Sequence, residues 1–380
     1  MTATTLYGLE PVLAEELRQM GASKIVQRSH AVDFCGDERL LYNANVSLRC
    51  ALRIQKPIYK FQVRNEDELY SGVQEIDWAD YFGVNDTFAV DSVVHSDYFN
   101  HSKYAALKVK DAIVDQFRNK GGIRPSVDVD NPKVRINIYI NEDSCILALD
   151  SSGTSLHKRG YRLEKNEAPL NEVLAAGLVM LSEWNKESNF IDPMCGSGTI
   201  VIEAAMMAYN IPPGINRTFG FMKWNDYNSV LWNSVRAEAL SKIGGYKHKI
   251  LGSDISQESI QIAKGNIARA KLQDKIELKV QSFEKLAPLS GGGILIFNPP
   301  YGERMKAENI EEFYAMIGDQ LKQRFSGYDA WVFSGNKDAL KHLGLRTSRK
   351  LTLYNGPLQC KFHKYSLYEG TKKTRKELIP

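Results

Sequence analysis

The sequence predicts an α/β protein whose C-terminal half is a doubly wound, mostly parallel sheet, preceded by smaller α+β units. From residue 170 onward, patterns with helical spacing alternate with short apolar runs, which is the order that builds parallel strands joined by helices. Before residue 157, short β-rich runs surround a few amphipathic helices. These two observations predict several domains with different architectures.

The composition is that of a folded protein of two or three domains. The chain has 380 residues, 43% of them hydrophobic, and its 49 basic and 45 acidic side chains give a net charge of +4. No apolar run reaches the roughly 20 residues of a membrane helix, and the start resembles no secretion signal. We therefore expect a cytoplasmic protein without a membrane partner. Five scattered cysteines and seven unclustered histidines predict reduced thiols and no metal site.

The first half of the chain predicts two α+β units, residues 1–53 and 54–156. The first unit combines two helical patterns with two strand-like runs, at 9–20, 38–51, 24–27 and 31–34. In the second unit, strand-like runs surround one strong amphipathic helix, at 88–90, 134–140, 145–149 and 103–117. Gly121 and Gly122 are expected to end that helix. Residues 157–166 are polar and basic and predict a linker to the C-terminal domain, 167–380.

The C-terminal domain predicts a mostly parallel seven-stranded sheet with an antiparallel edge. Its helical patterns lie at 170–181, 199–208, 256–270 and 311–325. Its parallel strands are expected at 190–191, 250–252, 276–280, 294–297 and 330–333. Two final strand-like runs, 351–354 and 359–367, flank an Asn-Gly-Pro turn and predict an antiparallel pair. Residues 209–249 interrupt the alternation with Pro, Gly and aromatic residues, and we expect an insertion folded over one face of the sheet.

The run Asp192-Pro-Met-Cys-Gly196-Ser-Gly198-Thr199 lies between a predicted strand and a predicted helix. Its glycines allow backbone N–H groups to approach a ligand closely, and the helix N-terminus favours an anionic group. A nucleoside-triphosphate loop would need a Lys after the glycines, and a dinucleotide fingerprint would need a third glycine, so neither fits. Asp192 at the strand end suits a cationic group, such as the amino group of an amino acid.

The next predicted strand ends at Ser253-Asp254. A carboxylate at this position can accept hydrogen bonds from both hydroxyls of a ribose, as in dinucleotide-binding folds. Together with Asp192, this describes a pocket for an amino acid joined to a nucleoside, which is the chemistry of S-adenosylmethionine.

Asn298-Pro299-Pro300-Tyr301 follows the apolar run 294–297, at the edge of the sheet where open α/β folds bind ligands. Two consecutive prolines hold an extended turn, so that the Asn298 carboxamide oxygen and the Pro299 carbonyl can act as acceptors at one place. Two acceptors on the N–H groups of a nucleobase amine would stabilise the positive charge that develops on methyl transfer. Tyr301 offers a stacking face for an extruded base. Alone, this run would predict a surface turn.

These motifs carry a family resemblance. DPMCGSGT with NPPYGER, preceded by SLHKRGYR and APLNE, resembles the THUMP-containing RNA guanine-N2 methyltransferases related to the large-subunit ribosomal RNA methyltransferase L. The opening YGLEPVLAEEL is similar to the family's N-terminal ferredoxin-like segment, and HSKYAALKVKDAIVDQF is similar to its THUMP helix. The resemblance implies a ferredoxin-like segment and THUMP module that hold structured RNA, followed by a Rossmann-like domain that methylates a guanine N2 amine with S-adenosylmethionine.

The resemblance also implies residue roles. The target amine would be held by Asn298, Pro299, Pro300 and Tyr301. The cofactor would be held by Ala168, Pro169, Asn171, Asp192, Met194, Cys195, Gly196, Gly198, Thr199, Asp254 and Ile255. Many relatives place an Asp after the third strand to meet the adenine amine, whereas this chain has Ser282 and Phe283 there. Ser282, nearby backbone groups or packing of Phe283 would then hold the adenine.

The basic residues of the predicted linker have two interpretations. They form either a solvated connector or a contact for RNA phosphates at a domain junction. The candidate RNA contacts in the THUMP helix and the linker are Lys103, Lys110, His157, Lys158, Arg159 and Arg162.

The sequence leaves several alternatives to methylation of ribosomal RNA at guanine N2. The substrate could be a transfer RNA, and an Asn-Pro-Pro-Tyr turn can also hold the amine of adenine N6 or of a glutamine amide. A non-catalytic RNA-binding assembly factor is the alternative from another class. Cys195 is not expected to act as a nucleophile, because no His or other base lies near it in the sequence.

Overall fold

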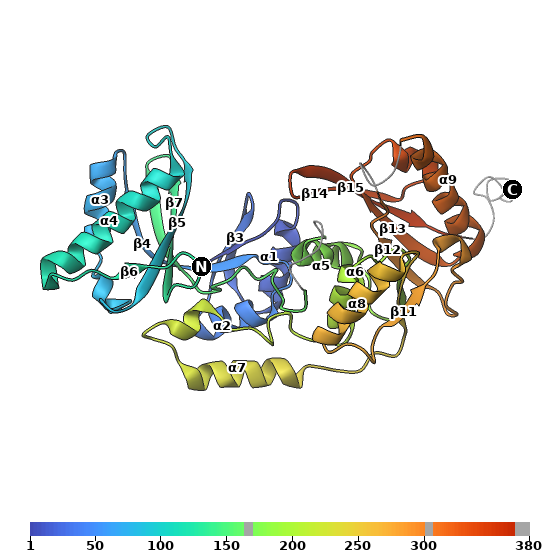
Figure 1. The fold of residues 1–380 in the computed structure, drawn as a ribbon, viewed down its shortest axis with the longest axis horizontal. Helices are drawn as coiled ribbons and strands as arrows, with labels where there is room; N and C mark the ends of the chain where they lie inside the picture. The colour runs from blue at the N-terminus through green and yellow to red at the C-terminus, as the bar shows by residue number, and fades with distance from the viewer. Residues whose placement is uncertain (163–169, 301–306, 369–380) are drawn as a thin grey trace, which may run out of the picture. The chain divides into compact units, whose positions relative to one another are not determined.

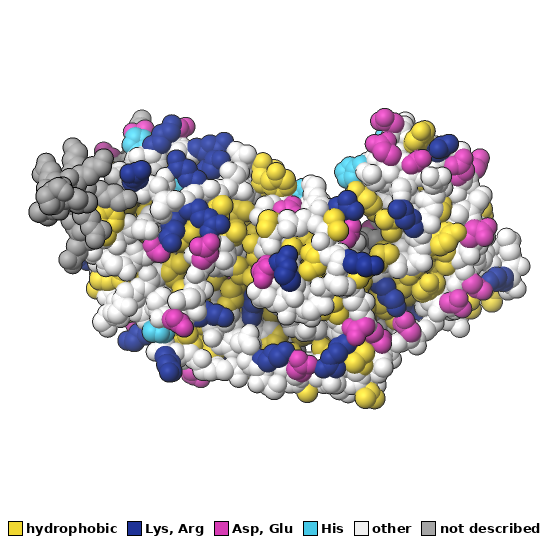
Figure 2. Space-filling model, turned by 180° about the vertical axis from the view of Figure 1, so that it is seen from behind, with side chains coloured by type: hydrophobic (Ala, Val, Ile, Leu, Met, Phe, Trp, Pro, Cys, Tyr) yellow, Lys and Arg dark blue, Asp and Glu magenta, His cyan; other side chains and the backbone are white. Residues whose placement is uncertain are grey.

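The structure is a computed structural model that describes residues 1–162, 170–300 and 307–368 (Figure 1). It divides the chain into two units. Unit 1 contains Met1–Thr5, Leu13–Leu156 and Gly214–Ala239, and unit 2 contains Leu6–Val12, His157–Pro213 and the chain from Leu240 onward. Figure 2 shows that basic and acidic side chains are interspersed on the surface, in keeping with their near balance in the sequence.

Unit 1 is built on one eight-stranded sheet with the order β2-β3-β1-β4-β8-β7-β5-β6. Its strands are β1 (Thr2–Thr4), β2 (Ser23–Arg28), β3 (Ala31–Cys35), β4 (Arg53–Gln62), β5 (Thr87–His95), β6 (Ser126–Val127), β7 (Val134–Asn141) and β8 (Ser144–Asp150). Because β4 pairs with β1 on one side and with β8 on the other, the two predicted α+β regions share a continuous sheet.

The helices of unit 1 are α2 (Glu38–Ser47), α3 (Glu66–Gln74), α4 (Ser102–Gly121) and the short η1 (Trp78–Asp80), while α1 (Glu10–Gln19) contains residues of both units. Helix α4 ends as expected at Gly122, whose φ of 73° is in the left-handed region that glycine adopts without strain. Helix α3 was not predicted. Its start is marked by the Asn65 side chain, which accepts hydrogen bonds from the N–H groups of Asp67 and Glu68.

The insertion does not fold over the C-terminal sheet, which corrects our expectation for residues 209–249. Its segment Gly214–Ala239, with η2 (Gly220–Lys223) and most of α7 (Ser229–Ser241), belongs to unit 1. The ring of Phe221 stacks on that of Tyr42 in α2, with centroids 4.2 Å apart. The N–H of Gly214 donates to the Val46 carbonyl over 2.9 Å. The aromatic residues of the insertion therefore complete the core of the N-terminal unit.

Unit 2 contains the predicted seven-stranded sheet, with the order β11-β10-β9-β12-β13-β15-β14. Its strands are β9 (Asn189–Asp192), β10 (Ile250–Asp254), β11 (Glu277–Val280), β12 (Gly293–Phe297), β13 (Tyr328–Ser334), β14 (Arg349–Asn355) and β15 (Leu358–Ser366). Strands β9 to β13 pair in parallel, and β15 joins β13 and β14 in antiparallel fashion. This confirms the expected antiparallel edge.

The helices of unit 2 are α5 (Glu172–Leu181), α6 (Thr199–Ala208), α8 (Gln257–Arg269), α9 (Ala307–Arg324) and the short η3 (Phe283–Lys285) and η5 (Ala339–Leu343). The chain runs from β9 to β10 and β11 on one side, then crosses to β12 on the other side of β9. Ligands of open α/β sheets bind at such a reversal, outside the carboxyl ends of the strands. Among the described residues, no helix has the length and hydropathy to cross a bilayer.

Candidate functional site

The loop between β9 and α6 is held open by two glycines with left-handed backbone. Gly196 has φ of 51° and Gly198 has φ of 82°, which other residues adopt only with strain. Gly198 is the N-cap of α6, and its N–H donates to the Cys195 carbonyl over 2.8 Å. The loop therefore presents backbone N–H groups and a helix N-terminus at the carboxyl edge of the sheet, as a carboxylate ligand requires.

Asp254, at the end of β10, is tied to this loop. One carboxylate oxygen accepts from the N–H of Gly196, and the other accepts from the N–H of Ser256, both over 2.9 Å. Each oxygen keeps a further lone pair, so that the carboxylate can also accept the two hydroxyls of a ribose. The neighbouring Ile255 leaves 76% of its surface exposed, so its side chain is accessible from solvent.

Asp192, at the end of β9, is only 1% exposed. Its Oδ1 accepts from the N–H of Met194 over 3.1 Å, which shapes the turn into the loop. Burial raises the pKa of this carboxyl well above its ordinary value, and the nearby charge of Asp254 raises it further. A cationic group would relieve both effects, in agreement with the expected ammonium of an amino acid.

Asn298 follows β12, the strand next to β9, where Leu295 lies opposite Ile191. Its side-chain Oδ1 is buried and has no hydrogen-bond partner among the residues that the structure describes. A buried acceptor without a partner costs about 1–3 kcal/mol, so a site that leaves one open is suited to a ligand with N–H donors. The adjoining Pro299 is buried, and Tyr301 lies outside the described residues.

Asn171 and Thr199 have local partners. The Asn171 side chain caps α5 by accepting from the N–H groups of Val173 and Leu174. The Thr199 hydroxyl accepts from the Arg162 guanidinium over 2.7 Å. Ala168 and Pro169 lie outside the described residues.

Cys195 is buried at 7% exposure within the loop. Burial raises the pKa of its thiol well above the ordinary value, and the charges of Asp192 and Asp254 act in the same direction. The thiol therefore stays protonated near neutral pH, which argues against a nucleophilic role.

Phe283 requires a correction. Its ring is 3% exposed and packs against Phe325 and Phe297, with centroids 5.6 and 5.8 Å away, in the core beneath α9. Because the ring is used by this core, it is not a face for adenine. Ser282 is half-buried directly before it and makes no capping hydrogen bond with its side chain to η3, so of the two residues Ser282 remains the candidate for the adenine amine.

Two basic residues of the linker are also placed differently from our expectation. The Arg159 side chain is 2% exposed, and its Nε lies 3.6 Å from the carboxylate of Glu203, which is fully buried in α6. Arg162 lies 3.5 Å from Glu172 of α5 and donates to the Leu170 carbonyl. These guanidinium groups anchor this segment to unit 2, and the Arg159 side chain is too buried to offer RNA a surface. The sequence holds a clue to these ion pairs: Glu172 in α5 and Glu203 in α6 each stand in an otherwise apolar helix, where a buried carboxylate needs a cation.

The other predicted RNA contacts lie nearer the surface. Lys103 and Lys158 are exposed, and His157 is half-buried. Lys110 forms an ion pair of 2.6 Å with Asp111, which partly neutralises it. Within the described ranges, no group of three His, Cys, Asp or Glu side chains could hold a metal ion.

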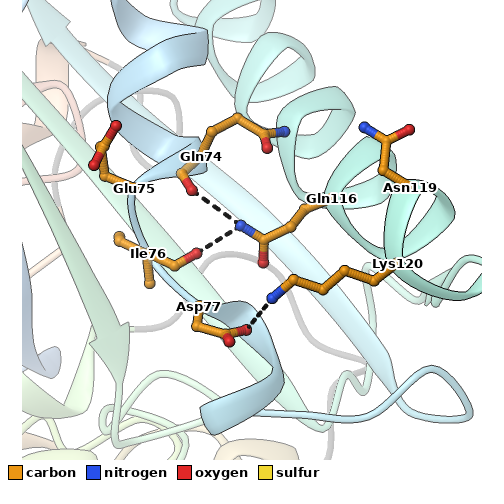
Figure 3. A pocket seen from close by; sticks show the side chains of 7 residues that line it. All are labelled: Gln74, Glu75, Ile76, Asp77, Gln116, Asn119 and Lys120. Atoms are coloured by element: carbon orange, nitrogen blue, oxygen red, sulfur yellow. Dashed lines mark hydrogen bonds and ion pairs between the residues drawn. The ribbon is translucent and has the colours of Figure 1, made fainter.

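A polar recess in unit 1 is lined by Gln74, Glu75, Ile76, Asp77, Gln116, Asn119 and Lys120 (Figure 3). The Gln116 amide nitrogen donates to the carbonyls of Gln74 and Ile76, and its oxygen accepts from the N–H of Trp78. Lys120 pairs with Asp77 over 2.9 Å. The hydrogen bonds of Gln116 and the ion pair of Lys120 join α4 to the end of α3 and the segment that follows it.

The parallel sheet carries a glycine loop, the carboxylate of Asp254 and the amide of Asn298 at neighbouring strand ends, which is the arrangement of an S-adenosylmethionine-dependent methyltransferase. Comparison with known families makes the assignment specific. Residues 159–364 match the RMKL-like methyltransferase domain, residues 63–150 match the THUMP domain, and residues 1–55 match the RlmL ferredoxin-like domain. The chain belongs to the RMKL-like methyltransferase family, which confirms the resemblance inferred from its motifs.

Individual relatives agree with this assignment. A putative RNA methyltransferase of Synechocystis is 41% identical, and the match covers 96% of each chain. The ribosomal RNA large subunit methyltransferase K/L of Syntrophotalea carbinolica is 37% identical over 97% of this chain, which spans 53% of that longer protein. The crystal structure of SMU.472, a putative methyltransferase complexed with SAH, superposes with a TM-score of 0.88 at 30% identity, covering 97% of this chain and 98% of that one.

Proposed function

We propose that this protein transfers a methyl group from S-adenosylmethionine to the N2 amine of a guanine in RNA, and that the substrate is large-subunit ribosomal RNA. The observation that carries the proposal is the buried Oδ1 of Asn298, which has no hydrogen-bond partner among the described residues and follows the strand next to β9. RNA as the acceptor is supported by the matches to the THUMP and RlmL ferredoxin-like domains. The Synechocystis and Syntrophotalea relatives are also named as RNA methyltransferases.

An exocyclic nucleobase amine is a weak nucleophile, because its lone pair is delocalised into the ring. Asn298 Oδ1 would accept one N–H of the amine, favour a pyramidal nitrogen and stabilise the positive charge that develops on it. Pro299 supplies a second carbonyl acceptor one residue later. When bound, S-adenosylmethionine supplies a methyl group on a positively charged sulfur.

The remaining residues position the reactants. Asp192 would hold the ammonium end of the cofactor and Asp254 its ribose, while Ile255 would pack on the adenine. Positioning of this kind supplies much of the rate gain of a bimolecular transfer, provided that the reacting atoms are held about 3–3.5 Å apart. The product amine carries an acidic proton that water can accept, so the chemistry needs no strong base.

The test is analysis of the methylated product. The purified full-length protein is incubated with S-adenosylmethionine labelled in its methyl group and, separately, with total RNA, DNA and protein from a cell lysate. Label in N2-methylguanosine from RNA supports the proposal. Label in N6-methyladenosine, in DNA or in a glutamine side chain would replace it with one of the alternative amine acceptors, and no transfer despite cofactor binding would favour a silent RNA-binding factor.

A further inference from the structure

A group of basic side chains lies on one face of the antiparallel edge of unit 2. Strand pairing places Lys350 of β14 opposite His363 of β15, and Thr352 opposite Lys361. Residues two apart on a strand share a face, so these four side chains lie together. The Lys361 ammonium donates to the Thr352 hydroxyl over 2.7 Å, which agrees with this arrangement.

The lysines of this face have no acidic partner in the described part of the chain. Among the residues that the structure describes, no carboxylate forms an ion pair with Lys350 or Lys361. Burial, and after it the charges of Lys350 and Lys361, lower the pKa of His363 to about 4, and the Tyr365 hydroxyl lies 3.4 Å from its Nδ1. The imidazole is therefore neutral near pH 7, beside two ammonium groups.

The opposite face of the same two strands shows the contrast. Arg349 pairs with Glu183 over 2.5 Å, and Lys364 pairs with Asp329 over 2.8 Å. Each cation on that face has an acidic partner. Lys350 and Lys361 are diagonal neighbours on the paired strands, which is within reach of long side chains, so their like charges repel each other and favour an anionic ligand between them.

The position of this face relative to Asn298 follows from the strand register. Phe297, the residue before Asn298, pairs with Val332, Val332 pairs with His363, and His363 pairs with Lys350. Neighbouring strands are about 4.8 Å apart, so His363 lies about 10 Å and Lys350 about 15 Å from β12 across the sheet. Figure 2 shows several Lys and Arg side chains close together on the surface of unit 2.

We propose that Lys350, Lys361 and His363 form a phosphate-binding surface that holds the backbone of the RNA a few nucleotides from the base at Asn298. The inference rests on the proposed function in taking RNA as the substrate. The lysines supply charge, and the Thr352 hydroxyl and the neutral imidazole supply additional hydrogen bonds. Such contacts fix the register of the RNA without reading its bases.

The test measures how salt affects binding of a fluorescein-labelled RNA of 20 uridines to the full-length protein, by fluorescence anisotropy. The double variant Lys350→Ala/Lys361→Ala removes two phosphate contacts, and each contact on single-stranded RNA contributes about 0.7 to the slope of log affinity against log salt. We therefore expect the slope to become shallower by about 1.4, with a loss of affinity of about tenfold or more at 100 mM salt.

Arg349→Ala is the matched control, because it removes one positive charge from the adjacent position on the opposite face. It should leave the slope unchanged and the affinity within about twofold. An unchanged slope in the double variant, or an equal loss of slope in Arg349→Ala, would overturn the proposal. Lys350→Glu provides a second variant at a single exposed position, and it must weaken binding more than Lys350→Ala does.

Two further readouts separate this proposal from the proposed function. Unchanged affinity for SAH, measured by calorimetry, shows that the cofactor site of the variants is intact. The binding assay involves no methyl transfer, so a shallower slope supports the phosphate surface whichever nucleoside is methylated. Conversely, if the wild type and the double variant both form N2-methylguanosine with the same KM for RNA, the result supports the proposed function and rejects this surface.

Discussion

The backbone N–H of Gly196 donates a 2.9 Å hydrogen bond to the carboxylate of Asp254. This bond joins the loop after β9 to the end of β10, so that the two regions proposed to hold the amino-acid and ribose parts of the cofactor are fixed to each other. The backbone of Gly196 is left-handed, a conformation that glycine adopts without strain.

The first prediction concerns Asn298. Asn298→Ala should lower the rate of methyl transfer to RNA by two orders of magnitude or more, because removing one contact to a developing charge typically costs 10²–10³ in rate. Affinity for SAH should stay within about twofold of the wild type. Single-turnover kinetics and calorimetry give the two values, and an unchanged rate would remove Asn298 from the mechanism.

The second prediction concerns Asp192. A carboxyl whose pKa is raised in the folded state favours folding at low pH, and this contribution is lost as the pH rises above its ordinary value of 3.8. As the pH rises above 3.8, burial of this carboxyl therefore lowers the stability of the cofactor-free protein. Asp192→Asn should raise the Tm without cofactor and weaken SAH binding by about 10- to 100-fold, the scale of a hydrogen bond to a charged group.

Thermal unfolding with and without SAH measures both effects of Asp192→Asn. A lower Tm in the absence of cofactor would show that the carboxylate stabilises the loop through its bond to Met194 more than burial destabilises it.

The third prediction concerns the linker. Arg159→Met removes the cation that lies 3.6 Å from the fully buried Glu203, whose carboxylate also accepts a hydrogen bond from the Tyr161 hydroxyl. It should lower the free energy of unfolding by about 3–5 kcal/mol, because a buried carboxylate loses its charged partner. Adding Glu203→Gln should recover a large part of that loss. Urea denaturation of the wild type, the two single variants and the double variant forms a double-mutant cycle. If the losses in free energy of unfolding are additive, the two side chains do not interact.

The fourth prediction concerns His363. Its pKa is lowered to about 4 in the folded protein, so its contribution to stability is present above pH 6.5 and is lost as the pH falls from 6.5 toward 4. His363→Gln should therefore flatten the decline of stability over this range. Bound RNA phosphates should raise the pKa of the imidazole, which NMR titration detects, and a pKa that RNA leaves unchanged would contradict a phosphate near the ring.

Much of the fold of unit 2 was predictable because its signals are local. The apolar runs of β9 to β13, the glycines of the loop and the Asn-Gly-Pro turn each specify their own conformation. For the same reason, the position of Asn298 at the strand edge could be inferred from the apolar run before it.

What could not be predicted depends on partners far away in the sequence. Arg159 looked like a surface cation, because its partner Glu203 is 44 residues away and lies inside an apolar helix. The insertion around Phe221 was assigned to the wrong unit, because its stacking partner Tyr42 belongs to the N-terminal part of the chain. Phe283 was interpreted as a ligand contact because a short run after a strand does not reveal which core it enters.

The most direct test of the central claim is mass-spectrometric mapping of modified nucleosides in large-subunit ribosomal RNA from a strain that lacks this protein. We predict that one N2-methylguanosine is missing from that RNA, that the wild-type gene restores it, and that the Asn298→Ala variant does not. A full set of N2-methylguanosines in the deletion strain, or equal restoration by Asn298→Ala, would contradict the account.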